Sequence, residues 1–600
     1  MNRRREVLEF GPFRINQGER LLRRADGVVP IPPKAIALLM ALVERPGEFV
    51  DKQELLNVVW PDTFVEDGSL TQMVSLLRKA LGASDDSPYI ETIPRRGYRF
   101  VAPVISIREE HGRAPALAVL PLANLSADAS QDVFVEGMTD ELISCLMHIE
   151  ALRVSSRTSV MAYRNSGKTL QQIAHELQVD WIVEGAVLQV GPSVRITAHL
   201  IDASTDHQLW AHSYERQLSE VLALQSAIAT DIATQVRVKV TSTKQSQMTR
   251  ARRVDPEAYD AYLRGRHFSN RRTREDLRRA VDYFRVAIDG DPTYAPAHAG
   301  LADTYALLGT IGFDVLPPRE AMPRASAAAG RALEIDGTMA QAHASLGYVK
   351  LSYEWDSTAA EERFTQAIAA DPTYATAYHW YGHCLFATAR LDEAAVAMCR
   401  AQQLDPLSVP FNLGIGWASY YQRRYDDAIV QYEKTLEIAP GVPLVMYELG
   451  LAYQNKGSLD QALEWFERAS VASKNEPASV MLRGHIYALL GRTADARRQR
   501  EKLVEISTRQ YVPALYTAFI YAGERNADEA FAWFDRACDE RSSYMIYLDV
   551  EPSLDHLRGD PRFEALVRRV GVRGKASGGT GERGTPANQN RTPNPKPTNA

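Results

Sequence analysis

The chain has 600 residues, of which 45% are hydrophobic and 24% are charged, and its formal net charge at pH 7 is −6. This composition excludes a wholly disordered chain and a collagen-like repeat, and the length predicts several domains of about 150 residues each. The overall negative charge excludes a nucleic-acid-binding protein that is basic throughout. Any contact with nucleic acid must therefore come from a local patch.

Two further features narrow the class. The four cysteines form no C-x-x-C pair, which excludes a disulfide scaffold and the usual structural zinc sites. The sequence has no run of about 18 apolar residues that could span a membrane. The basic start leads into no apolar segment of the kind found in secretory signals. We therefore expect a cytoplasmic protein without membrane contact.

Changes in composition and periodicity divide the chain into five segments. Residues 1–104 mix helix and strand patterns, and residues 105–115 are a polar linker. Residues 116–245 alternate strands and helices, and residues 255–570 are almost wholly helical. Residues 571–600 hold few apolar side chains and should be disordered. The expected fold class is multidomain: an α+β domain, then an α/β domain, then an all-α superhelix.

The first segment contains three helix patterns followed by a strand hairpin. Pro33 opens the first helix, and Asp51 caps a second helix that stops before Pro61. A third helix should run from Ser69 to Leu81. The hairpin lies in residues 89–104, with two arginines and a glycine at its turn. Three helices and a basic hairpin indicate a winged helix-turn-helix.

The third helix has an apolar face and an opposite face of amide, hydroxyl and cationic groups. Gln and Arg side chains can read base edges in the major groove, whereas Ser, Thr, Lys and Arg suit phosphate oxygens. These residue types predict an interface with double-stranded DNA. The candidate DNA-binding residues are Ser69, Thr71, Gln72, Ser75, Arg78 and Lys79 on the helix, and Arg95 and Arg96 at the hairpin.

The sequences VEDGSLTQMVSLLRKAL (65–81) and ETIPRRGYRF (91–100) resemble the DNA-binding domain of the OmpR/PhoB class, in the branch of ToxR, CadC and HilA. The resemblance implies that the third helix is the recognition helix and that the hairpin is the wing. It also implies that Arg78 contacts DNA. Met73 and Leu76 depart from the polar residues that many members have there. A homodimer on DNA is a further expectation.

The middle segment (116–245) resembles the TolB amino-terminal-like domain, which implies an α/β fold but no particular ligand. Ser166-Gly167-Lys168-Thr169 resembles the end of a phosphate-binding loop, but Ala162 stands where that loop needs a glycine. Neither a set of metal ligands at the right spacing nor a nucleophile–base motif occurs. We therefore expect no catalytic residue, no metal, no cofactor and no enzymatic activity.

The helical segment repeats every 34 residues. Pro372, Pro406 and Pro440 recur at this spacing, and small residues such as Gly382 and Gly416 recur between them. The pattern resembles the tetratricopeptide repeat (TPR), in which helical pairs stack into a superhelix with a concave inner surface. We count about eight repeats. Such a groove is expected to hold a protein or peptide ligand.

These features together predict a sequence-specific DNA-binding transcriptional regulator. The winged helix would read promoter DNA, and the TPR array would receive a protein or peptide signal. The alternative is a TPR interaction scaffold whose winged-helix domain mediates protein contacts. The cations on both the helix and the wing favour the regulator.

Overall fold

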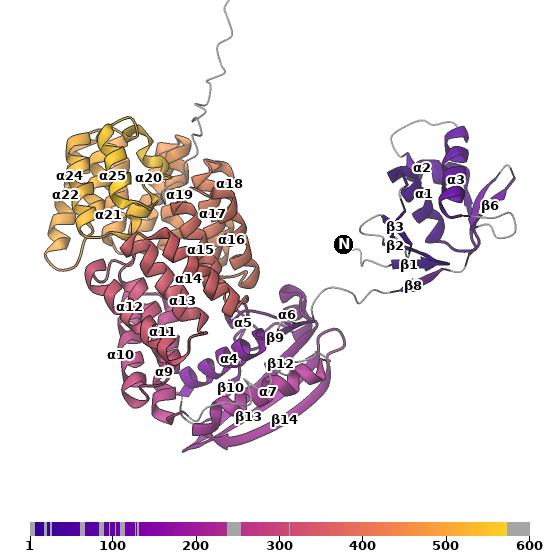
Figure 1. The fold of residues 1–600 in the computed structure, drawn as a ribbon, viewed down its shortest axis with the longest axis horizontal. Helices are drawn as coiled ribbons and strands as arrows, with labels where there is room; N and C mark the ends of the chain where they lie inside the picture. Colours follow the sequence, from indigo (N-terminus) through magenta and orange to yellow (C-terminus); the bar gives the residue numbers. More distant parts are fainter. Residues whose placement is uncertain are drawn as a thin grey trace, which may run out of the picture. The chain divides into compact units, whose positions relative to one another are not determined.

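The computed structural model describes most of the chain, in two compact units, Met1–Ala114 and Pro115–Ala600. Each unit is described by itself, and Figure 1 labels its elements. The described residues are 7–16, 21–24, 27–29, 31–60, 67–82, 89–94, 96–102, 104–107, 115–126, 128, 131–149, 151–236, 254–310 and 312–572.

The first unit opens with an antiparallel sheet of short strands in the order β4-β3-β2-β1-β8. The strands are β1 (Val7–Phe10), β2 (Phe13–Asn16), β3 (Leu21–Arg24), β4 (Gly27–Val28) and β8 (Ile105–Ile107). β8 corrects the expectation that the linker begins at residue 105, because Val7 pairs with Ile107 in the register of β1 and β8. The first domain therefore extends to residue 107 by pairing its two ends.

Three helices follow the sheet. They are α1 (Pro33–Val43), α2 (Lys52–Val59) and α3 (Asp67–Ala80). The Asp51 carboxylate accepts a hydrogen bond from the backbone N–H of Gln53 at 2.8 Å and so caps α2. Apolar residues of all three helices, including Leu39, Leu55 and Val74, are buried in one core.

The wing is a second, three-stranded sheet in the order β5-β7-β6. It consists of β5 (Phe49–Asp51), β6 (Ile90–Ile93) and β7 (Gly97–Phe100), all antiparallel. A Cβ atom at Gly97 would lie 2.1 Å from the carbonyl oxygen of Val50, so only glycine fits where β7 meets β5. Tyr98 and Phe100 are buried in the core. The three helices and this hairpin confirm the winged-helix fold.

The second unit begins with a mixed sheet. Its strands are β9 (Ala116–Val119), β10 (Ala123–Asn124), β11 (Arg153–Val154), β12 (Trp181–Val190), β13 (Ser193–Asp202) and β14 (His207–Gln217). β9 runs parallel to β11 and β12, while β12, β13 and β14 form an antiparallel meander. The mixed sheet confirms the α/β class of this segment.

The helices of the α/β segment are α4 (Asp132–Met147), α5 (Arg157–Met161), α6 (Leu170–Leu177) and α7 (Val221–Gln235). Figure 1 shows α4 between the sheet and the first helices of the repeats. Arg266 of the repeats forms ion pairs with Asp140, at 2.5 Å, and with Glu141, both on α4. The α/β segment and the repeats therefore form one unit and are not independent domains.

The repeat region consists of paired antiparallel helices, confirming the all-α class. Eight pairs lie within the described residues: α9 (Pro256–Arg271) and α10 (Arg274–Gly290), α11 (Ala295–Leu308) and α12 (Pro318–Ile335), α13 (Ala340–Val349) and α14 (Ser357–Ala370), α15 (Ala375–Ala387) and α16 (Leu391–Leu404), α17 (Val409–Tyr421) and α18 (Tyr425–Ile438), α19 (Pro443–Lys456) and α20 (Leu459–Ala472), α21 (Pro477–Leu489) and α22 (Thr493–Ser507), and α23 (Ala514–Gly523) and α24 (Ala527–Asp539).

Glycines mark the points where paired helices approach most closely. A Cβ atom at Gly416 would lie 2.0 Å from the ring of Tyr432, and one at Gly450 would lie 2.3 Å from the ring of Phe466. Tyr432 and Phe466 are themselves fully buried. The 34-residue spacing of small residues thus reflects an aromatic side chain on the second helix packing against the backbone of the first.

The carboxyl-terminal segment folds back onto the repeats. It comprises η4 (Ser543–Tyr547), η5 (Pro552–Leu557) and α25 (Pro561–Val570). Gly571, with a φ of 69°, ends α25, and the carbonyl of Val572 accepts a hydrogen bond from the Ser357 hydroxyl at 2.6 Å. Residues 571 and 572 therefore belong to the folded unit and not to the expected disordered tail. Residues 573–600, and residues 237–253 after α7, lie outside the described residues.

Candidate functional sites

The exposed face of α3 carries most of the side chains expected to bind DNA. Thr71, Gln72, Ser75 and Lys79 are exposed, and Ser69 is half-buried. Leu70, Val74 and Leu77 on the opposite face are buried in the core of the unit. Burial of this apolar stripe fixes the orientation of α3. The opposite face therefore presents a row of hydroxyl, amide and ammonium groups to the solvent.

Arg78 lies differently from its neighbours. Its guanidinium is half-buried and donates hydrogen bonds to the carbonyl oxygen of Ile90, at 2.7 Å and 3.1 Å, and to the hydroxyl of Thr92, at 2.8 Å. Ile90 and Thr92 are in β6 of the wing. Arg78 thus joins α3 to β6 of the wing by hydrogen bonds. Its contact with DNA stays a prediction.

The tip of the wing carries the remaining candidates. Arg96 is exposed, and its guanidinium lies 4.9 Å from the centre of the Phe49 ring, which orients it by a cation–π contact. Arg95 lies outside the described residues. Arg99, which sequence reasoning did not select, lies 3.7 Å from the Glu91 carboxylate across the hairpin. Cross-strand alternation could have indicated this pair, since residues 91 and 99 face each other in β6 and β7.

Lys168, from the resemblance to a phosphate loop, lies in a local ion pair. Its ammonium is 2.7 Å from the Glu176 carboxylate, and it also lies over the Tyr163 ring.

The described residues contain no group of three or more His, Cys, Asp and Glu side chains that could hold a metal ion. None of the described helices is both long and apolar enough to cross a membrane.

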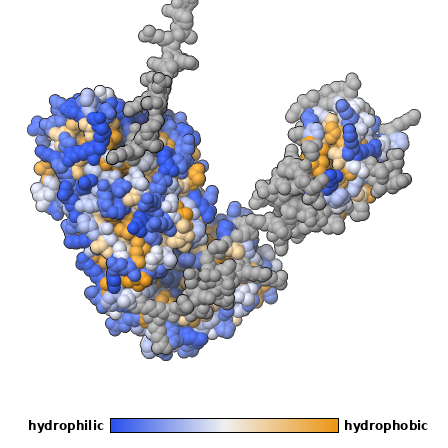
Figure 2. Space-filling model, viewed as in Figure 1, coloured by the Kyte–Doolittle hydropathy of each residue, from blue (hydrophilic) through white to orange (hydrophobic). Residues whose placement is uncertain are grey.

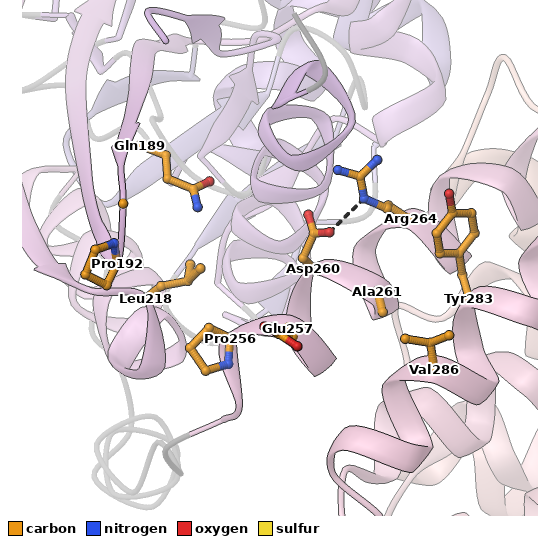
Figure 3. A pocket seen from close by; sticks show the side chains of 11 residues that line it. Gln189, Pro192, Leu218, Pro256, Glu257, Asp260, Ala261, Arg264, Tyr283 and Val286 are labelled. Atoms are coloured by element: carbon orange, nitrogen blue, oxygen red, sulfur yellow. Dashed lines mark hydrogen bonds and ion pairs between the residues drawn. The ribbon is translucent and has the colours of Figure 1, made fainter. Parts of the chain in front are cut away.

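A recess of about 460 Å³ lies where the α/β segment joins the first repeat. Figure 3 shows Gln189 and Pro192 on one side of it and Tyr283 and Val286 on the other. Its one guanidinium, from Arg264, is bound to Asp260 at 2.7 Å. Because Arg264 is paired with Asp260 and the walls come from both segments, we interpret the recess as part of the junction between them.

A far larger cavity, of about 1270 Å³, lies inside the superhelix of repeats. Its walls come from the first helices of the pairs, from the turn between α9 and α10, from α4 and α5, and from the carboxyl-terminal segment. The space-filling view shows a mainly hydrophilic exterior over the repeats (Figure 2). The cavity wall is by contrast rich in aromatic side chains: Phe313, Tyr348, Tyr374, Trp380, Phe411, Trp417, Tyr420, Tyr421, Tyr447, Tyr516, Phe519, Tyr544 and Tyr547.

The carboxyl-terminal segment covers part of the inner surface that was expected to hold an extended peptide. The Tyr420 hydroxyl donates to Glu551 at 2.8 Å, and the Tyr547 hydroxyl lies 2.8 Å from Nδ1 of His383. On another side, the hydroxyls of Ser156 and Thr158 donate to Asp405 at 2.6 Å and 2.9 Å. The chain's own residues therefore cover part of the space between the repeats.

Comparison with known families agrees with this architecture. Residues 26–100 match the family "Transcriptional regulatory protein, C terminal". Residues 113–231 match the second domain of HilA/YgeH-like transcriptional regulators, and residues 356–408 and 413–477 match the tetratricopeptide repeat. The chain has the domain architecture of a HilA-like regulator. This supports the resemblance to the ToxR, CadC and HilA branch and refines the middle segment from TolB-like to the HilA second domain.

The relatives include two proteins named as transcriptional regulators and one named as an enzyme. The chain is 27% identical to the transcriptional regulator HilA of Salmonella typhimurium over 424 residues, which are 70% of this chain and 74% of HilA. It is 34% identical to the transcriptional activator CadC of Escherichia coli over 117 residues, 19% of this chain and 23% of CadC. A Rhizobium meliloti protein named putative adenylate cyclase 3 is 32% identical over 248 residues, 40% of each chain.

Proposed function

We propose that this HilA-like chain is a sequence-specific DNA-binding transcriptional regulator. The observation that carries the proposal is the exposed row of Gln72, Ser75 and Lys79 on α3, held against the wing by Arg78. The amide of Gln72 can contact base edges in the major groove, and the Ser75 hydroxyl and the Lys79 ammonium can contact the phosphates beside it. The match of residues 26–100 to a regulator family supports the same reading.

The repeat array serves in this proposal as the receiver of a signal, from a protein or a peptide. Its outer helices remain open to such a partner, whereas its inner surface is partly covered by residues 543–557. A homodimer on DNA is proposed as the active form, and the length of DNA protected from nuclease by the full chain would test it. The alternative is a TPR scaffold whose winged helix contacts protein.

We infer that regulation involves no catalysis by this chain. Two of its relatives are named as transcriptional regulators, one over 70% of this chain. The relative named adenylate cyclase gives the direct control: incubation of the purified chain with ATP and Mg²⁺ should yield no cyclic AMP above a blank. Formation of cyclic AMP by the chain would overturn this inference.

The test of DNA binding uses residues 1–107, which include β8. Fluorescence anisotropy on fragments of duplex DNA at a series of salt concentrations should show binding that weakens steeply with salt, because phosphate contacts release counterions. Lys79→Ala should lower the salt slope by about one. Arg45→Ala is the matched control, since Arg45 is paired with Glu54 at 2.6 Å away from α3. Equal slopes for both variants, or no binding at low salt, would favour the scaffold.

A further inference from the structure

The turn between α9 and α10 places a run of cationic side chains in the wall of the large cavity. Arg271, Arg272 and Arg274 all line it. Arg272 ends α9 in the left-handed region, with a φ of 51°, which points the chain inward at this turn. Arg271 lies 3.5 Å from Asp276, and Arg274 lies 3.5 Å from Glu476. Arg271 and Arg274 therefore each form an ion pair with a carboxylate.

Arg272 has none. Among the described residues, no carboxylate lies within 4.0 Å of its guanidinium, and its side chain forms no hydrogen bond. Burial lowers the pKa of Arg272, against the weaker opposing effect of Asp303, Tyr374 and Asp405. Arg272 is half-buried, so its guanidinium keeps contact with the cavity and can pair with an anion that enters it.

Other polar atoms in the same wall also lack partners. The hydroxyl of Tyr447, Nδ1 of His379 and Nε2 of His485 are buried without a hydrogen bond. His379 is only 5% exposed and Tyr447 is 8% exposed. The phenol of Tyr447 is a donor, so this wall has an unmet demand for a hydrogen-bond acceptor.

The carboxylates of the wall do not meet that demand. Asp140 is bound to Arg266, Asp405 to Ser156 and Thr158, and Glu551 to Tyr420 and Tyr544. Asp371 accepts from the hydroxyl of Thr373 at 2.6 Å. Burial raises the pKa of Glu448 to about 8, so that this carboxyl is mostly uncharged at neutral pH. Asp303 and Asp405 act on Arg272 only at longer range, so among the described residues its guanidinium has no direct ion-pair partner.

Aromatic side chains lie in the same space. His379 and His383 are 4.7 Å apart between ring centres, and Trp417 lies 5.2 Å from His383. Trp380 packs 4.9 Å from Tyr348, and both line the cavity. Burial lowers the pKa of His383 to about 4, so these rings are neutral and offer flat, apolar faces. A planar ring is the ligand part that such faces accept.

We propose that the cavity of the repeats binds a small organic anion with an aromatic body, whose acidic group pairs with Arg272 and whose ring lies among Trp380, His383 and Trp417. The carboxyl-terminal segment covers part of this space, which leaves less room for an extended peptide and so favours a small molecule. The site supplies a signal input distinct from the winged helix. It does not depend on DNA binding, and the test below uses no DNA.

The test uses a pair of fluorescent probes on the purified full chain. 8-Anilinonaphthalene-1-sulfonate is an aromatic anion, and N-phenyl-1-naphthylamine is its neutral counterpart. We expect the wild type to bind the anion at one site, and Arg272→Gln to bind it at least ~10-fold more weakly, because a charge-assisted pair is lost. Binding of the neutral probe should be the same in both proteins. Arg278→Gln, on the exposed face of α10, is the control for net charge and should bind both probes as the wild type does.

Competition identifies the acidic group. Displacement of the probe by benzoate, and not by inorganic phosphate, indicates a carboxylate ligand, whereas displacement by phosphate indicates a phosphorylated one. Circular dichroism verifies folding, and if Arg272→Gln does not fold, Thr376→Trp is used to fill the cavity and should abolish binding of both probes. Equal affinity of the anion for Arg272→Gln and Arg278→Gln, or no saturable binding by the wild type, would overturn the proposal.

Discussion

Arg78 on α3 donates two hydrogen bonds to the carbonyl oxygen of Ile90 on β6 of the wing. The recognition helix and the wing are the two elements that a winged helix brings to DNA. Besides the apolar core that both elements share, this planar side chain joins them directly. Its third bond, to the Thr92 hydroxyl, fixes the plane of the guanidinium.

Arg78→Ala and Arg78→Lys should separate bracing from direct contact with DNA. Loss of a bonded, half-buried guanidinium should lower the free energy of unfolding of residues 1–107 by about 1–3 kcal/mol. Lysine keeps the charge but not the planar fork, so Arg78→Lys should be almost as unstable as Arg78→Ala and should bind DNA as weakly. Urea unfolding and anisotropy measure the two effects. Full DNA binding by Arg78→Lys would mean that the side chain acts as a simple phosphate contact.

Gln72 is predicted to read a base. Gln72→Ala should weaken binding to the target sequence by about 1–3 kcal/mol and leave binding to random DNA unchanged, since a bidentate amide–base pair contributes only at the specific site. Gln53→Ala on α2 is the control, because Gln53 is exposed but bonds within its own helix at 3.4 Å to Asn57. A competition assay with specific and random duplexes measures both. Equal losses on the two duplexes would refute a base-reading role.

Glu448 should make the repeat unit less stable at alkaline pH. Its pKa is about 8 in the folded chain, above its usual value of 4.5, chiefly because of burial. The folded state therefore holds the proton more tightly than the unfolded state, and stability falls as the pH rises from about 4.5 to about 8. Glu448→Gln should show a smaller drop in the melting temperature between pH 6 and pH 9 than the wild type. Parallel pH profiles for the two proteins would contradict this, and Glu433→Gln, at an exposed position on α18, serves as the control.

Gly416 tests whether the repeats are needed for regulation. A tryptophan there must displace the Tyr432 ring, at a cost of about 1–3 kcal/mol or more, and the disorder should spread to neighbouring repeats. Gly416→Trp should keep DNA binding in a mobility shift but lose the response of a reporter gene. Gly330→Trp is matched, because no atom lies within 4 Å of a Cβ atom at that glycine. A normal reporter response with a disordered repeat array would show that the repeats are dispensable.

The sequence predicted what depends on local spacing. The start of α1 at Pro33, the cap of α2 at Asp51, the buried stripe of α3 and the 34-residue period each depend on one or two helices. The structure confirms these features because short-range periodicity decides which face of a helix is buried.

Features that depend on distant contacts were missed. The sequence analysis places β8 in the linker, because a strand of three residues shows no local pattern. Its partner β1 lies almost a hundred positions earlier in the sequence. The Glu551 carboxylate accepts a hydrogen bond from Tyr420, which lies 131 positions earlier in the sequence. The missing partner of Arg272 and the bracing role of Arg78 are likewise properties of the folded chain, since neither follows from the residues beside them in sequence.

Genome-wide DNA occupancy of the tagged full chain tests the central claim most directly. The account predicts discrete peaks that share a sequence motif and lie at promoters. In Gln72→Ala with Lys79→Ala these peaks should be lost, and in Gln53→Ala they should remain. Absence of discrete peaks, or peaks that persist unchanged when the exposed face of α3 is altered, would contradict the claim that this helix reads promoter DNA.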